Sequence, residues 1–205
     1  MKIIVAGFVL ANLFFLGNCS SDQPPTLPIP TKSNDPVVDE LGAQSIEFVP
    51  EETSEIDLIY QDIRKMIEAV YQADVQTTLL FTHPKVIKLM GGQEQAAVYL
   101  EKVYGKFDKA GLKLKSQTFP SEPIFLSTNE RRYVIVPTLI VVEINGQTLE
   151  SLNYQFGVLE KGASNWKYLE GSRVNNQTVN QFFSDFPSDY KFPQIYRKKI
   201  SNIEH

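Results

Sequence analysis

Two β-rich runs joined by a two-residue turn constrain the fold of this chain more than any other feature. Residues 132–144 read Arg-Tyr-Val-Ile-Val-Pro-Thr-Leu-Ile-Val-Val-Glu-Ile, and Asn145-Gly146 follows at once. Asn-Gly between two such runs is a strong hairpin signal, because both residues adopt positive φ readily. Pro137 has no N–H to donate, so the first run needs an edge position or a bulge there. The sequence therefore predicts a long antiparallel hairpin.

The returning run alternates between large apolar and small or polar side chains, which indicates a strand with two different faces. The apolar face holds Leu152, Tyr154, Phe156 and Val158, and the other face holds Ser151, Asn153, Gln155 and Gly157. Shorter strands are predicted over residues 112–119, 124–126 and 166–169. Together these segments predict an antiparallel meander.

Helical periodicity precedes the strands. Ser54 with Asp57 three residues later matches an N-terminal capping pattern, and apolar residues then recur at helical spacing to about residue 73. Further helices are predicted over residues 75–81 and 93–109. Helices followed by an antiparallel meander predict an α+β protein, with the N-terminal helices packed in a curved antiparallel sheet that encloses a cone-shaped pocket.

The first residues predict export. Lys2 precedes an uncharged, mostly apolar stretch over residues 3–16, which suits a signal-peptide core of roughly 7–15 residues better than a membrane span of about 20. The following Leu-Gly-Asn-Cys19 resembles the bacterial lipobox, although Asn18 stands where Gly, Ala or Ser is usual. We expect removal of residues 1–18 and acylation of Cys19 by diacylglyceryl and an amide-linked chain such as palmitate. The alternatives are cleavage elsewhere and an uncleaved anchor.

A proline-rich segment separates this signal from the rest of the chain. Residues 19–50 hold six of the 12 prolines and few large apolar side chains, which predicts a flexible spacer. One globular domain is then predicted over residues 51–205. Asp22 comes later than the usual inner-membrane retention position, which favours the outer membrane of the bacterial cell envelope. With Cys19 as the only cysteine, the chain can form no internal disulfide.

The composition argues against several classes of protein. A net charge of −4 and a pI near 5.3 provide no basic field for nucleic acid. We find no phosphate-binding loop, dinucleotide fingerprint or Gly-x-Ser-x-Gly elbow, so no cofactor is predicted. Two histidines and one cysteine do not make a metal-ligand cluster, so no metal is predicted. The basic run at residues 196–199 is expected to be a solvated tail.

Three segments resemble uncharacterised exported bacterial proteins. They are residues 81–92 (Phe-Thr-His-Pro-Lys-Val-Ile-Lys-Leu-Met-Gly-Gly), residues 162–171, which end in Asn-Trp-Lys-Tyr-Leu-Glu-Gly, and residues 185–190 (Asp-Phe-Pro-Ser-Asp-Tyr). The resemblance covers about residues 56–195 and implies the cystatin-like cone of the nuclear transport factor two-like superfamily. That superfamily includes SnoaL-like polyketide cyclases, ketosteroid isomerases and scytalone dehydratases. Its members are enzymes, ligand binders and interaction modules, so the resemblance implies a fold more than a function.

Enzymes of this superfamily place an Asp or His base inside the cone, often with Tyr partners, and three residues here are candidates. His83 is the histidine that lies within the predicted domain elements, although its place before Pro84 also suits a helix cap. Asp74 follows the first helix and could face the pocket, or be solvated. Glu143 would have a raised pKa if it pointed inward.

Aromatic side chains on the strands are the candidates for lining the pocket. Tyr154, Phe156 and Trp166 would line the cone, with ordinary core packing as the alternative. The favoured hypothesis is a membrane-anchored envelope lipoprotein whose domain binds a small apolar ligand or an envelope protein without catalysis. The alternatives are a SnoaL-like enzyme of proton-transfer or hydrolytic chemistry, with His83 or Asp74 as base, and an interaction module with a filled cone.

Overall fold

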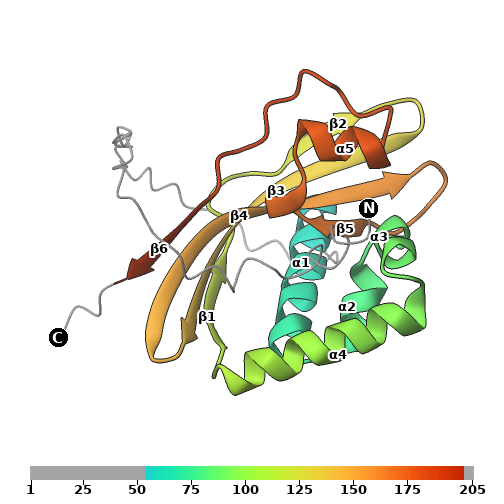
Figure 1. The fold of residues 1–205 in the computed structure, drawn as a ribbon. Helices are drawn as coiled ribbons and strands as arrows, with labels where there is room; N and C mark the ends of the chain where they lie inside the picture. The colour runs from blue at the N-terminus through green and yellow to red at the C-terminus, as the bar shows by residue number, and fades with distance from the viewer. Residues whose placement is uncertain (1–53, 201–205) are drawn as a thin grey trace, which may run out of the picture.

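Helices come first and strands follow, as predicted. The computed structural model describes residues 54–200, so the predicted signal peptide, Cys19 and the spacer lie outside the described residues. The helical elements are α1 (Glu55–Tyr71), α2 (Val75–Phe81), α3 (Pro84–Leu89), α4 (Gln93–Lys109), η3 (Gly171–Arg173) and α5 (Asn176–Phe182). The strands are β1 (Lys113–Thr118), β2 (Ile124–Ser127), β3 (Arg131–Ile144), β4 (Gln147–Glu160), β5 (Lys167–Glu170) and β6 (Tyr196–Ile200). This arrangement confirms the α+β class, with N-terminal helices packed against a curved antiparallel sheet (Figure 1).

Helix α1 begins and packs as its sequence predicts. The Oγ of Ser54 accepts a hydrogen bond from the backbone N–H of Asp57 at 3.2 Å, which caps the helix. Ile59, Ile63 and Ile67 follow at helical spacing, and all three are buried against the sheet. The cap and the apolar stripe thus fix both the start of α1 and the face it turns to the sheet.

Strands β3 and β4 form the long hairpin. Each has 14 residues, and they pair along their full length from Arg131–Glu160 to Ile144–Gln147. Asn145 and Gly146 have φ values of 49° and 71°, which is the left-handed turn expected of Asn-Gly. On the other edge of β3, β2 pairs with residues 132–135 and β1 with residues 139–143. Pro137 lies in the gap between them, where β3 needs no donor on that edge.

The C-terminal basic run is a strand, so the expectation of a solvated tail was wrong. Tyr196–Ile200 pairs antiparallel with residues 148–152 of β4. Its polar side chains are held by Glu150, which accepts a hydrogen bond from the hydroxyl of Tyr196 at 2.8 Å and pairs with the ammonium of Lys198 at 2.8 Å. Charged residues are typical of a strand at a sheet edge.

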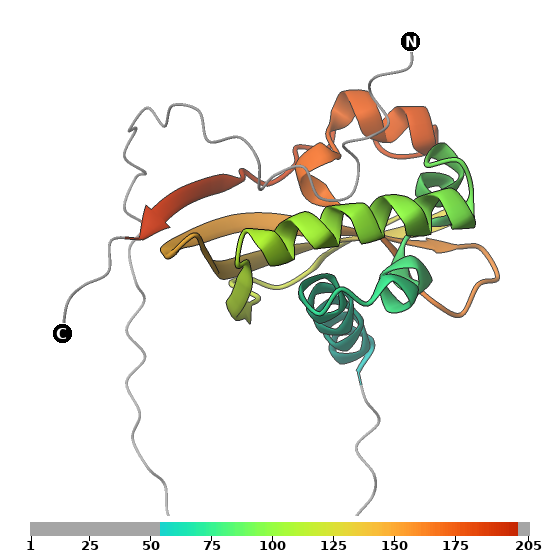
Figure 2. The ribbon, with the colours of Figure 1, turned by 60° about the horizontal axis from the view of Figure 1, so that its bottom comes forward.

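Helices pack on both faces of the hairpin formed by β3 and β4. On one face α1 packs against Val134, Val136 and Tyr168, and α4 in turn packs against α1 and α2 (Figure 2). On the other face lie α5 and the aromatic segment after it (Figure 1), a layer that the sequence analysis did not predict. This second layer decides which residues of β4 are left to face the first.

Two glycines should respond oppositely to the same substitution. A Cβ at Gly171 would lie 2.2 Å from both the ring and the carbonyl oxygen of Tyr154, whereas a Cβ at Gly105 in α4 meets nothing within 4 Å. We expect Gly171→Ala to lower the free energy of unfolding by roughly 2 kcal/mol through overpacking. Gly105→Ala should raise it by about 0.5–1 kcal/mol through helix propensity. Urea unfolding followed by circular dichroism checks this, and shifts of the same sign would contradict it.

Candidate functional site

A cavity of about 140 Å³ lies between α1, α2 and the sheet. Apolar side chains make most of its wall, among them Met66, Ile67, Val70, Ile140, Val142 and Leu149. Polar groups enter from the strands, with Ser151, Asn153 and Gln155 on β4, Glu170 on β5 and Arg197 on β6. An apolar cavity of about 150 Å³ is large enough to take up benzene. The space therefore suits a body of about one six-membered ring.

Gln155 carries an unpaired polar atom in this wall. It lies in β4 between Val136 of β3 and Glu170 of β5, and only 3% of its surface is exposed. Its Oε1 has no hydrogen-bond partner among residues 54–200. Leaving such a buried acceptor unpaired costs about 1–3 kcal/mol.

The neighbouring carboxylate, by contrast, is already engaged. Glu170 lies directly opposite Gln155 in the β4–β5 pairing. The amide nitrogen of Asn153 donates to its Oε1, and the hydroxyl of Ser172 donates to its Oε2. Glu170 is thus held in place by the two neighbouring side chains that donate to it.

A cation and a phenol stand elsewhere in the wall. Arg197 of β6 lies opposite Ser151 of β4 and lines the cavity. Burial raises the pKa of Tyr71 to about 12, although the positive charge of Arg197 acts to lower it. The strand that was expected to be a solvated tail therefore contributes to the cavity wall.

The three aromatic residues predicted to line the pocket do not line this cavity. Tyr154 and Phe156 point to the opposite face of β4, into the cluster beneath α5, where Tyr154 stacks on Phe192 at 5.6 Å. Trp166 packs on the α1 side in the core around Val134, away from the cavity wall. The alternation of β4 was correctly predicted, but its polar face is the one that borders the cavity.

Asp74 and Glu143 also lie away from the cavity. Asp74 is the exposed N-cap of α2, and its carboxylate accepts from the backbone N–H of Thr77 at 3.0 Å. Hydrogen bonds from Thr77 lower the pKa of Asp74. Glu143 pairs with Lys115 at 2.6 Å, and this hydrogen bond and charge lower its pKa. Since Val142 beside it lines the cavity, Glu143 points to the other face of β3.

His83 is buried, with 2% of its surface exposed, and it caps α3. Its Nδ1 accepts from the backbone N–H of Lys85 at 3.1 Å, so the proton of the neutral ring sits on Nε2. Nε2 has no hydrogen-bond partner among the described residues and lies 3.6 Å from Oε1 of Glu160. Burial lowers the pKa of His83 to about 4, although the charge of Glu160 opposes this shift. The ring is therefore neutral at ordinary pH.

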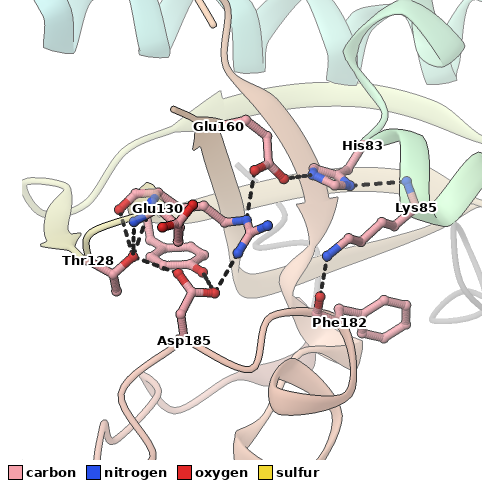
Figure 3. A network of polar contacts seen from close by, with 9 residues as sticks. His83, Lys85, Thr128, Glu130, Glu160, Phe182 and Asp185 are labelled. Carbon is pink, nitrogen blue, oxygen red and sulfur yellow. Dashed lines mark hydrogen bonds and ion pairs between the residues drawn. The ribbon is translucent and has the colours of Figure 1, made fainter. Parts of the chain in front are cut away.

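The polar network around His83 ties the C-terminal segment to the sheet (Figure 3). Arg131 lies between two carboxylates, 2.8 Å from Glu160 through Nε and 2.6 Å from Asp185 through Nη1. Asp185 also accepts from the hydroxyl of Thr128 at 2.6 Å and from that of Tyr133 at 2.9 Å. Burial acts to raise the pKa of Asp185, but these hydrogen bonds hold it below its ordinary value. The network belongs to the α5 face, whereas the cavity belongs to the α1 face.

Neither a metal-binding cluster nor a membrane-spanning helix is present in residues 54–200. No group of three or more His, Cys, Asp and Glu side chains gathers closely enough there to hold a metal ion. No helix in this range has the length and apolar character that crossing a membrane requires.

Comparison with known proteins adds little to this picture. No protein-family model matches the chain, and no curated protein matches it. Among solved structures it is similar to an NTF2-like protein from Cytophaga hutchinsonii, with 20% sequence identity and a TM-score of 0.33 over 57% of this chain and 93% of that one. At this level the likeness says nothing about function, and the α+β assignment stands on the element order and strand pairing described above.

The depressed pKa of His83 should appear in the pH dependence of stability. Between about pH 6.5 and about pH 4 the unfolded chain binds a proton that the folded chain excludes. Stability from this residue is therefore complete above that window and is lost as the pH falls through it, by about 3 kcal/mol in total. His83→Asn keeps a side chain that can cap α3 but does not titrate.

As the pH falls from about 6.5 to about 4, the difference in free energy of unfolding between the wild type and His83→Asn should fall by about 3 kcal/mol. Urea unfolding at several pH values measures the difference, in which the titrations of groups remote from residue 83 cancel. A difference that stays constant with pH would contradict the assignment.

Proposed function

We propose that the domain binds a small, predominantly apolar ligand in the cavity between α1, α2 and the sheet, and performs no chemistry on it. The observation that carries the proposal is the apolar cavity of about 140 Å³ itself. Its wall is mostly apolar, and its size is close to that of a cavity that takes up benzene. A larger side chain at Val70 or Val142 would fill the space.

The positions of the candidate bases support binding over catalysis. The enzyme alternative relied on His83 or Asp74, and neither is among the residues that line the cavity. The carboxylate that does line it, Glu170, accepts hydrogen bonds from Asn153 and Ser172. Both oxygens of this carboxylate are therefore engaged within the protein.

Filling the cavity should abolish ligand binding. Val142→Phe places a ring in the space, and a steric conflict of only ~1.4 kcal/mol already weakens binding tenfold. The matched control is Val141→Phe, because Val141 is the adjacent residue of β3 and does not line the cavity. Native mass spectrometry of protein purified from its source envelope should show a retained small molecule on the wild type and on Val141→Phe. Val142→Phe should retain at least about ten times less.

Two results would overturn the proposal. Equal retention of the small molecule by Val142→Phe and Val141→Phe would place the binding site elsewhere. A co-purified polypeptide on the wild type, without any small molecule, would make the domain an interaction module.

We further propose that the domain is held at the outer membrane of a bacterial envelope by acyl chains on Cys19. The support is the order of features in the sequence, which runs from a basic residue through an apolar core to a lipobox-like cysteine and a proline-rich spacer. Two or more acyl chains anchor a protein stably where one chain binds only marginally. The spacer would hold the domain away from the bilayer surface.

Replacing the cysteine tests the anchor directly. Cys19→Ala should release the protein from the membrane fraction and remove the mass of the acyl groups, whereas Ser20→Ala should keep both. Fractionation of cells followed by intact-mass spectrometry measures the two effects. A Cys19→Ala protein that stays with the membrane at unchanged mass would contradict lipidation.

A further inference from the structure

We infer that the ligand of this cavity is a small carboxylic acid with a compact apolar body, whose carboxylate is bound by the guanidinium of Arg197. The inference rests on the proposed function and deepens it. Arg197 lies on β6, directly opposite Ser151 of β4, and both residues line the cavity. Of the described residues that line the cavity, Arg197 carries the positive charge and Glu170 the negative one.

The strand pairing turns the side chain of Arg197 toward the cavity. Residues directly opposite each other in an antiparallel pair project from the same face of the sheet, and Ser151 lies on the face of β4 that borders the cavity. The charge of Arg197 also acts on the wall. Burial raises the pKa of Tyr71, another lining residue, and the positive charge of Arg197 acts to lower it. The guanidinium therefore lies within electrostatic range of the cavity wall.

A guanidinium selects a planar anion. It presents five N–H donors in a rigid fork, so Arg197 can keep a contact within the protein and still donate to both oxygens of a carboxylate. Such pairing offsets the cost of taking the ligand's charge out of water. The cost is also smaller at this place, because Arg197 is only half-buried and β6 lies at an edge of the sheet (Figure 1).

The carboxylate of Glu170 stands at the other end of the polar wall. Glu170 lies opposite Gln155, four residues along β4 from Ser151. At about 3.3 Å per residue, this separation is roughly 13 Å of strand. A ligand carboxylate in contact with Arg197 is therefore several times closer to the positive charge than to the negative one, and the attraction outweighs the repulsion.

The rest of the wall selects a compact apolar body. Side chains from α1 and the hairpin enclose the space, including Met66, Val70, Ile140 and Leu149. Its volume of about 140 Å³ is close to that of the ~150 Å³ cavities that hold benzene. A single ring or a short branched chain that bears one carboxylate fits both parts of the wall.

Three probes of one shape separate the charge from the body. At pH 7 benzoate is an anion, benzamide is its neutral isostere, and benzamidine carries a positive charge on the same frame. Titrating the full chain with each probe, followed by amide chemical shifts in NMR, gives the three dissociation constants. We expect benzoate to bind at least about tenfold more tightly than benzamide, and benzamidine to bind most weakly.

Substitution of the cation should remove the preference. In Arg197→Gln we expect benzoate and benzamide to bind within about threefold of each other, with benzamide binding retained. Lys198→Gln is the matched control, because it removes the same charge from the next residue of β6, which pairs with Glu150 and does not line the cavity. It should keep the preference for benzoate. An equal loss of preference in both variants would assign the effect to the overall charge of the strand and overturn the inference.

The failures of the two proposals are distinguishable. If benzamide or benzamidine binds the wild type as tightly as benzoate, the inferred carboxylate is wrong while the binding cavity stands. If no probe shifts amides of the cavity-lining residues, the proposed function fails as well. The comparison of probes on the wild type decides the inference even if Arg197→Gln does not fold.

Discussion

The full-length pairing of β3 with β4 determines where every other element of this domain lies. The two strands pair residue by residue from Arg131–Glu160 to Ile144–Gln147, so each cross-strand pair presents its side chains to one of two buried faces. A shift of one residue would exchange the faces. It would turn the side chain of Gln155 into the aromatic core and Phe156 toward α1. The register is held at one end by the Asn145-Gly146 turn and at the other by the ion pair between Arg131 and Glu160.

The α5 face of the hairpin is closely packed with aromatic side chains. Tyr133, Phe156, Phe183 and Phe186 meet there with ring centroids 5.1–6.0 Å apart, a spacing at which aromatic pairs attract beyond the area they bury. Gly171 permits this packing, because a Cβ there would overlap the ring of Tyr154. Asp185 ties the same segment to Arg131 and Tyr133.

The sequence predicted what local signals determine and missed what distant segments decide. The hairpin, the cap of α1 and the capping position of His83 all follow from residues within a few positions of one another. Which face of β4 borders the cavity does not follow from nearby residues. It depends on α5 and the aromatic residues after it, which carry no strong periodicity. β6 was missed because its charges resemble those of a tail, and the partner of Lys198 and Tyr196, Glu150, lies across the sheet. The sequence did hold one signal for the face that borders the cavity. Polar residues occupy every second position of β4, and an aromatic-rich segment that could cover the other face follows later in the chain.

The residues that line the cavity could not be recognised as a group from the sequence. Gln155 and Glu170 become neighbours only through the antiparallel pairing of β4 with β5, and Arg197 joins the wall only through β6. No motif spacing describes such a set, since each member is placed by a different strand pairing. A search for catalytic residue types favoured His83 and Asp74, whose chemistry is used instead for helix caps. Local contacts account for these candidates, because His83 and Asp74 cap helices and Glu143 pairs with Lys115, whereas the cavity wall is assembled by strand pairings between distant segments.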